Sequence, residues 1–220
     1  MRLLVISDVH ADARSLDTVL ADAAERGWDQ VVFLGDAIGY GSEPAAAVAR
    51  LRTLDFRAAL SGNHEAMLDI LRQGRAPNAA DRINDILASH LRELGPDDLE
   101  FLDRLQPEYL DDDWAAVHGA LRTRFEYLIS VPVARSNASH MKRDVYFVGH
   151  THVPGAFLRE PDGAWGVRPF REGQGTLRLE PGVQAFLNPG SVSLPRDRTP
   201  GSSYGIFDEV SRTFSVFRVN

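Results

Sequence analysis

Residues 3–10 have the sequence LLVISDVH, in which four apolar residues lead into Ser7, Asp8 and, after one valine, His10. The same order recurs along the chain, because largely apolar runs at 31–34, 56–60, 114–117 and 145–148 each precede a short polar motif. These motifs are Gly35-Asp36, Gly62-Asn63-His64-Glu65, His118-Gly119 and Gly149-His150-Thr151-His152. Short continuous apolar runs are typical of strands buried on both faces of a layered α/β fold.

Loops beyond the carboxyl ends of such strands form the ligand crevice of an α/β sheet, so the five motifs are expected to converge. Two pairs, Asp8-x-His10 and His150-x-His152, are expected to be extended, with both side chains of each pair on one side and Thr151 on the other. The motifs supply enough donors for two divalent metal ions. These donors are Asp8, His10, Asp36, Asn63, His118, His150 and His152.

Two metal ions about 3.5–4 Å apart can hold a bridging hydroxide and stabilise both oxygens of an in-line displacement at phosphorus. Asp36 has two carboxylate oxygens and can bridge such ions, and Gly35 lets the backbone approach closely. Each motif alone is compatible with an ordinary turn or a structural histidine, whereas the ordered set indicates hydrolysis of a phosphate ester. The other two histidines are interpreted differently, His90 as a packing residue and His140 as solvated.

The composition narrows the class of protein. A length of 220 residues with 44% hydrophobic residues predicts a single domain over 1–220. The net charge of −7 argues against stable nucleic-acid binding. The lack of cysteine excludes disulfides and thiolate zinc sites and fits a reducing cytoplasm. No run approaches the roughly 20 apolar residues of a membrane span, so a cytoplasmic protein without membrane contact is expected.

Outside the motifs, helical spacing predicts a helix over 15–27 that stops at Gly27 and a second helix that opens at 42–44. Residues 66–110 are predicted to be an all-helical insertion, which either covers the site or only packs on the flank of the fold. Six short strands between 156 and 219 predict a second, largely antiparallel sheet.

The ordered motif set resembles that of the calcineurin-like metallophosphoesterases, most of all the small single-domain phosphodiesterases of bacteria and archaea, from Asp8 to about Phe207. The resemblance implies an α/β fold made of a two-sheet β-sandwich flanked by helices. It also implies that Asp36 bridges two metal ions and that His64 stabilises the transition state or protonates the leaving oxygen. By position, the first ion is held by Asp8, His10, Asp36 and His152, and the second by Asp36, Asn63, His118 and His150.

The resemblance makes Arg122 and Arg196 candidate substrate contacts, with surface salt bridges as the alternative for both. Glu65 stands where many small phosphodiesterases have aspartate. The family favours manganese as the metal, and the ligand set also suits iron, zinc, cobalt or nickel. The expected activity is hydrolysis of a small, nucleotide-type phosphodiester. A phosphomonoesterase and a non-catalytic scaffold of the same fold stay open as alternatives, as does the oligomeric state.

Overall fold

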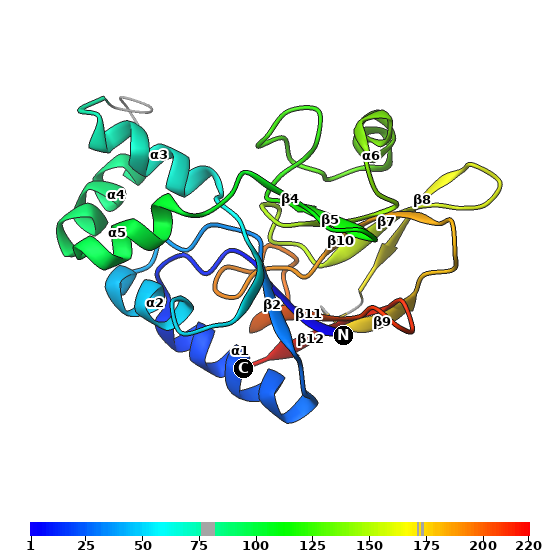
Figure 1. The fold of residues 1–220 in the computed structure, drawn as a ribbon, viewed down its shortest axis with the longest axis horizontal. Coiled ribbons are helices and arrows are strands. Elements are labelled where there is room, and N and C mark those ends of the chain that lie inside the picture. Colours follow the sequence, from blue (N-terminus) through cyan, green and yellow to red (C-terminus); the bar gives the residue numbers. More distant parts are fainter. Residues whose placement is uncertain (76–81, 171, 173) are drawn as a thin grey trace.

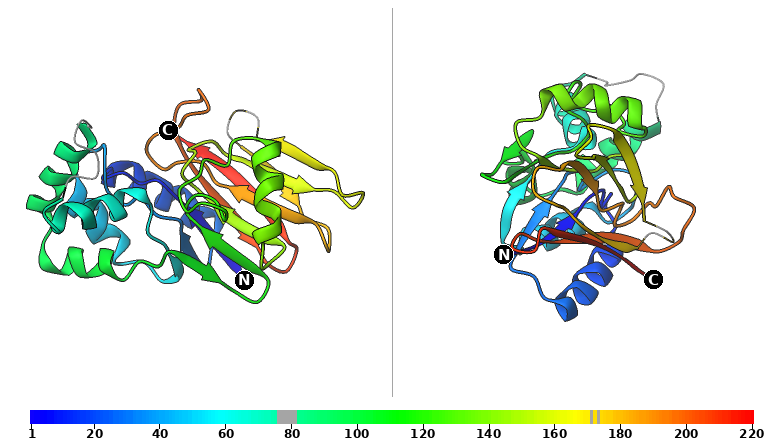
Figure 2. Two further views of the ribbon diagram at one scale, coloured as in Figure 1. Left: turned by 90° about the horizontal axis from the view of Figure 1, so that it is seen from above. Right: turned by 90° about the vertical axis from the view of Figure 1, so that its right-hand side faces the viewer.

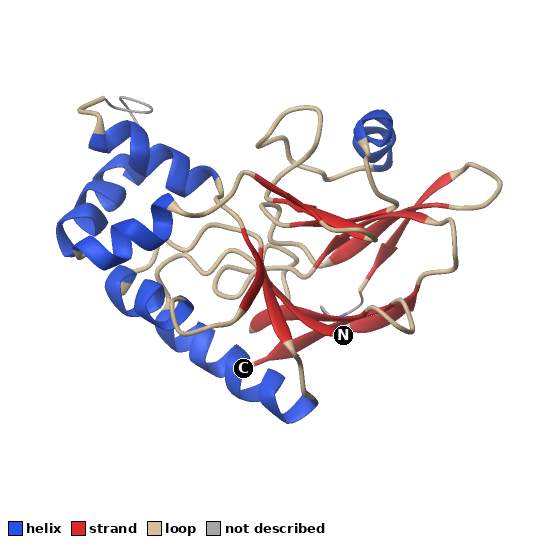
Figure 3. Ribbon diagram, in the orientation of Figure 1, coloured by secondary structure: helices blue, strands red, loops and turns tan. Residues whose placement is uncertain are grey.

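Two six-stranded mixed sheets stack face to face in the computed structural model, which describes residues 1–75, 82–170, 172 and 174–220 (Figures 1 and 3). The first sheet has the strand order β3 (Phe56–Ala59), β2 (Gln30–Phe33), β1 (Arg2–Ile6), β11 (Ser202–Asp208), β12 (Thr213–Val219) and β9 (Gly175–Arg178). The second has the order β4 (Glu108–Leu110), β5 (Trp114–Val117), β6 (Val145–Val148), β10 (Gln184–Asn188), β7 (Gly155–Arg159) and β8 (Trp165–Pro169). The predicted two-sheet sandwich is confirmed.

Successive side chains of a strand point to opposite faces of its sheet, and this creates one apolar layer on each face. Leu3 and Val5 of β1 pack between the two sheets, against residues such as Phe147 of β6, whereas Leu4 and Ile6 face the opposite side. The helices α1 (Ala13–Arg26) and α2 (Pro44–Leu51) cover that outer face of the first sheet. On the other side, α6 (Val131–Asn137) covers the outer face of the second sheet (Figure 2). The first strand is therefore buried on both faces, as its continuous apolar run predicts.

The first two predicted helices are confirmed with small shifts in their bounds. Asp12 caps α1 by accepting a hydrogen bond from the Ser15 N–H at 2.9 Å, and Gly27 ends it with a φ of 78°. Pro44 lies in the first turn of α2, where its missing N–H has no intrahelical partner to lose. The short α6, which begins with Ser130 as its cap and is followed by a 3₁₀ turn at Ala138–His140, was not predicted.

The helical insertion gathers at one end of the sandwich, at the upper left of Figure 1. It contains α3 (Asn63–Arg72), α4 (Arg82–Glu93) and α5 (Pro96–Asp103), while residues 76–81 lie outside the described part of the chain. The prediction of an all-helical segment over 66–110 is wrong at its end. Residues 108–110 form the edge strand β4, which pairs antiparallel with β5. Three residues are too few to display an alternating pattern.

The predicted second, antiparallel sheet made only of late strands is also wrong. The late strands do form, but β9, β11 and β12 extend the first sheet, and β7, β8 and β10 extend the second. Thus β11 pairs antiparallel with β1, and β10 pairs parallel with β6. A pattern of alternating apolar residues identifies a strand but not the strand with which it pairs. Within the described residues, no helix is long and apolar enough to cross a membrane.

Candidate metal centre

Five turns, which follow β1, β2, β3, β5 and β6, bring all seven predicted metal donors into one cluster between the ends of the two sheets. Six of the seven side chains are buried, and Asn63 is partly buried. Within the described residues, three groups of histidine and carboxylate donors lie close enough to share an ion. They are Asp8–His10–His152, His10–Asp36–His64 and Asp36–His118–His150.

The first side of the cluster contains Asp8, His10, His152 and one oxygen of Asp36. The Nε2 atoms of His10 and His152 are 3.1 Å apart, and His152 Nε2 is 3.2 Å from Asp8 Oδ1. His10 Nε2 lies 3.9 Å from Asp8 Oδ1 and 3.9 Å from Asp36 Oδ2. Donors that share an ion with bonds of about 2.1 Å lie roughly 3.0 Å apart when they are neighbours and up to about 4.2 Å apart when they are opposite, so these four atoms could surround a common cation.

The second side is centred on His118. Its Nε2 lies 3.2 Å from Asp36 Oδ2, 3.2 Å from Asn63 Oδ1 and 3.2 Å from His150 Nδ1. Asp36 Oδ2 therefore belongs to both sides, while Asp36 Oδ1 accepts a hydrogen bond from the His64 N–H at 3.0 Å. One carboxylate oxygen is thus left free of backbone donors at the point where the two groups meet.

Backbone carbonyls fix which nitrogen of three rings faces the cluster. The Nδ1 atoms of His10, His118 and His152 donate to the carbonyl oxygens of Ile38, Leu34 and Leu194 at 3.1, 2.8 and 2.6 Å. Each Nε2 then turns a lone pair inward, unless a second proton is bound. Inward lone pairs beside two buried carboxylates repel one another, so the cluster needs protons or cations. The donor set fits divalent metal ions.

The predicted extended backbone at the two histidine pairs is wrong. Asp8, His10, Asp36, His150 and His152 all have left-handed backbone, with φ between 49° and 65°. A non-glycine residue in this conformation costs about 1 kcal/mol, and the surrounding hydrogen bonds maintain it. The His10 N–H donates to Asp36 O at 2.9 Å, and the Asp8 N–H donates to Gly35 O at 3.0 Å. Each tight turn aims its side chain into the cluster.

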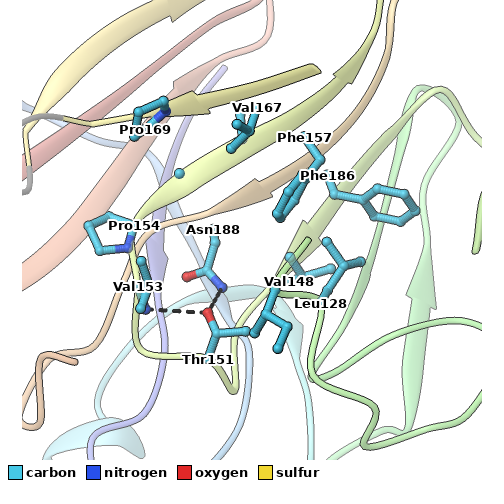
Figure 4. Close-up of a pocket in the computed structure, with 13 residues that line it drawn as sticks. Leu128, Val148, Thr151, Val153, Pro154, Phe157, Val167, Pro169, Phe186 and Asn188 are labelled. Carbon is cyan, nitrogen blue, oxygen red and sulfur yellow. Dashed lines mark hydrogen bonds between the residues drawn. The ribbon is translucent and has the colours of Figure 1, made fainter. Parts of the chain in front are cut away.

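The segment at the end of β10 holds two of these turns in place. Ser191 Oγ donates to Asp8 O at 2.9 Å, and Asn188 Nδ2 donates to Gly149 O at 2.9 Å and to Thr151 Oγ1 at 3.0 Å. Figure 4 shows Thr151 turned toward Asn188, where it lines an apolar pocket of about 190 Å³ with residues such as Val153 and Phe157. Thr151 therefore belongs to a different surface from the two histidines that flank it in sequence.

Glu65 holds the backbone of the turns that carry two of the donors, and sequence analysis missed this role. Its buried carboxylate accepts hydrogen bonds from the N–H groups of Gly62, Asp36 and Ala37 at 2.7, 2.9 and 2.8 Å. Burial and the neighbouring Asp36 charge raise the pKa of Glu65 to about 7. Its place in the first turn of α3 was the available signal, since a carboxylate there satisfies free backbone donors. Glu65 thereby joins the turns that carry Asp36 and Asn63.

His64 lies beside the cluster with Nε2 3.9 Å from Asp36 Oδ2. Its buried Nδ1 has no hydrogen-bond partner, and it packs so closely on Gly39 that a Cβ there would collide with the ring. Burial lowers the pKa of His64, and the charge of Asp36 opposes this effect. Tyr40 packs edge-on against both His64 and His10, with ring centroids 4.9 and 4.8 Å away.

The two predicted substrate arginines have different surroundings. Arg122 is half-exposed and forms an ion pair with Glu126, which matches the surface salt bridge that was its alternative. Arg196 is exposed and interacts with the hydroxyl of Tyr40 at the rim of the cluster. Tyr127 was missed by sequence analysis, and its ring stacks on His150 with a centroid distance of 4.0 Å.

Without a bound metal ion, His118 is expected to hold a proton near neutral pH, and metal binding is expected to displace this proton. Burial alone would lower the pKa of His118, but the charge of Asp36 and a hydrogen bond to it raise this pKa to about 9. We therefore expect the affinity for Mn²⁺ to rise with pH, by up to about tenfold per unit below pH 9. Calorimetric titrations in two buffers of different protonation enthalpy measure the released proton.

The stability of the metal-free protein is expected to change in the opposite direction. The raised pKa of His118 stabilises the fold below the ordinary value of 6.5, and this contribution is lost as the pH rises through about 9. Thermal denaturation of metal-free protein between pH 6.5 and 9 measures the loss. A metal affinity that does not change over the same range contradicts the assignment of the proton to His118.

A sandwich of two mixed sheets, with carboxylates, imidazoles and an amide gathered at the strand ends, defines a metal-dependent hydrolase. The model of the calcineurin-like phosphoesterase superfamily domain matches residues 1–212 of the chain. The protein belongs to this superfamily, as its motifs predict.

Three proteins illustrate the relationship. The crystal structure of a metallophosphoesterase from Sphaerobacter thermophilus superposes with a TM-score of 0.86 at 32% identity, covering 100% of this chain and 89% of that one. Protein MJ0912 of Methanocaldococcus jannaschii is 28% identical over 99% of this chain and 86% of its own length. Phosphodiesterase YfcE of Escherichia coli K12 is 25% identical over 100% of this chain and 93% of its own length.

Proposed function

We propose that this protein is a dinuclear metal-dependent phosphodiesterase that hydrolyses small, nucleotide-type phosphodiesters. The observation that carries the proposal is the position of Asp36 Oδ2, which lies 3.9 Å from His10 Nε2 and 3.2 Å from His118 Nε2, between two groups of donors. The name of the YfcE relative supports a diester as the substrate. The lack of cysteine supports a cytoplasmic location.

The two ions are assigned to the two sides of the cluster, with Asp36 shared. Asp8, His10, Asp36 and His152 would hold the first ion, and Asp36, Asn63, His118 and His150 would hold the second. When bound, divalent ions supply positive charge for the phosphate and lower the pKa of water at the site. Manganese is our choice among metals that accept mixed nitrogen and oxygen ligands.

The side chains of the protein orient the ester and move the proton. The Nε2 atom of His64 lies beside Asp36, and its buried Nδ1 has no hydrogen-bond partner; we assign to His64 the donation of a proton to the leaving oxygen. Arg196, which meets Tyr40 at the rim, is a better candidate for contact with the phosphate than Arg122, which is paired with Glu126. Buried ligands exclude bulk water from the cluster, which strengthens each of these interactions.

The test uses metal-stripped protein refilled with Mn²⁺ and compares bis-p-nitrophenyl phosphate with p-nitrophenyl phosphate. We expect faster cleavage of the diester, with no cleavage by the metal-free protein. Faster cleavage of the monoester overturns the diester assignment in favour of a phosphomonoesterase. No cleavage of either ester, with metal bound, favours a binding scaffold.

A further inference from the structure

A cavity of about 480 Å³ lies beside the cluster, between the candidate site and the helical insertion. Asn63, His64 and Tyr40 form its walls on the side of the metal donors. The rest of its lining comes from α3 and α4 and consists of Met67, Ile83, Ile86 and the exposed Arg82. The insertion therefore contributes a surface next to the reacting groups and does more than pack on the flank of the fold.

His64 links the cluster to this cavity, as its neighbour Asn63 also does. Its Nε2 lies 3.9 Å from Asp36 Oδ2, and its ring also lines the cavity. A general acid must lie within hydrogen-bond reach of the oxygen that it protonates. If His64 protonates the leaving oxygen, the group attached to that oxygen is directed into this cavity. Among the described residues that line the apolar pocket beside Thr151, none is a histidine or a carboxylic acid that could protonate a leaving oxygen.

A buried histidine fixes the two walls of the cavity relative to each other. His90 of α4 accepts a hydrogen bond at Nδ1 from the Gly39 N–H at 3.2 Å, and its Nε2 donates to Gly41 O at 2.9 Å. These two glycines flank Tyr40. Burial lowers the pKa of His90, which agrees with a neutral ring that accepts at one nitrogen and donates at the other. His90, which was predicted to be a packing residue, thus joins α4 to the segment Gly39–Gly41 by hydrogen bonds.

The walls favour a planar, largely apolar occupant. Met67, Ile83 and Ile86 present aliphatic and thioether surface, and Tyr40 presents an aromatic ring that is about half-exposed. Thioether and aromatic groups pack well on the faces and edges of flat rings. Small polar alcohols and sugars would leave this surface uncovered.

Resting on the proposed function, we propose that this cavity binds the leaving group of the ester and selects alcohols that carry a planar ring, as nucleosides do. Ile86 is then a specificity-determining residue, because its side chain lines the cavity without belonging to the metal donors. The helical insertion would set the substrate class, while the strand-end turns would provide the chemistry.

The experiment varies the leaving group alone. Methyl p-nitrophenyl phosphate and methyl 4-methylumbelliferyl phosphate share the methyl group and differ in the ring that departs. Ile86→Trp, which fills the cavity, is expected to lower kcat/KM for the one-ring ester on the order of tenfold, and more for the two-ring ester. Ile86→Ala, which enlarges the cavity, is expected to shift the preference toward the two-ring ester.

A second pair of esters shows which substituent occupies the cavity. Thymidine 5′-(p-nitrophenyl phosphate) and methyl p-nitrophenyl phosphate share the leaving group and differ in the group that stays on phosphorus. For each pair, the quantity compared is the ratio of the two kcat/KM values. If the Ile86 variants change this ratio for the second pair and leave it constant for the first pair, the cavity holds the retained group and the proposal is overturned.

The matched control is Ile70→Trp, because Ile70 is a partly buried isoleucine of α3 outside the cavity lining. It is expected to leave both ratios unchanged, and an effect equal to that of Ile86→Trp counts against a specific pocket. Wild-type, metal-loaded protein that cleaves none of these esters contradicts the proposed function itself. Failure of the cavity proposal is therefore distinguishable from failure of the phosphodiesterase proposal.

Discussion

Asp36→Asn is expected to release both metal ions and to reduce kcat on the order of 10³-fold or more, since bound metals supply several kcal/mol of transition-state stabilisation. The His64 N–H already engages one oxygen of Asp36 at 3.0 Å. An asparagine would place its carbonyl oxygen there and turn its NH₂ group toward the donors of both sides. An amide NH₂ has no lone pair for a metal. Metal analysis and steady-state kinetics on the same sample measure both effects.

The control for this experiment is Asp98→Asn. Asp98 is also buried and accepts a hydrogen bond from the Gly95 N–H at 3.0 Å, but it lies at the start of α5, outside the cluster. This variant is expected to lose stability while keeping its metal and its kcat. An Asp36→Asn protein with both ions bound and a tenth or more of wild-type kcat contradicts a bridging role for Asp36.

His64→Ala is expected to lower kcat on the order of 10²-fold or more for esters with poor leaving groups, with both metal ions still bound. Because a phenolate of low pKa departs without protonation, the loss is expected to be smaller for p-nitrophenyl esters than for phenyl esters. A plot of kcat against leaving-group pKa, measured for wild type and variant, therefore separates proton donation from a merely structural role.

The alternative for His64 is coordination, since its Nε2 lies in a possible metal group with His10 and Asp36. Loss of one ion in the His64→Ala variant supports that alternative and contradicts the role of His64 as a general acid. His140→Ala serves as the control, because His140 is exposed in the 3₁₀ turn after α6. It is expected to match wild type in metal content and in leaving-group dependence.

The sequence was sufficient to predict a two-sheet sandwich through the resemblance of its motifs. It was also sufficient to pick out the polar side chains that the fold gathers, because each follows a recognisable strand. The run Leu3–Ile6 shows a strand buried on both faces, and the polar residues that follow it mark its carboxyl end. Which strands pair with one another could not be predicted from the sequence. The parallel pairing of β10 with β6, for example, is encoded by no local pattern.

Backbone direction at the donors was predicted incorrectly for a different reason. Left-handed backbone is uncommon at residues other than glycine, although aspartate and histidine adopt it more often than most, so a two-residue spacing was interpreted as extended. Tertiary hydrogen bonds, such as that from Ser191 Oγ to Asp8 O, override that propensity. The supporting roles of Glu65 and His90 were missed because their partners are backbone groups distant in sequence.

The left-handed turns also have an energetic consequence. At Asp8, His10, Asp36, His150 and His152, glycine would adopt the same backbone without steric cost. Each of these five side chains is therefore present at a local cost of about 1 kcal/mol, which the hydrogen bonds around the turns offset. Part of the hydrogen bonding that stabilises the fold thus serves to aim these side chains at one another.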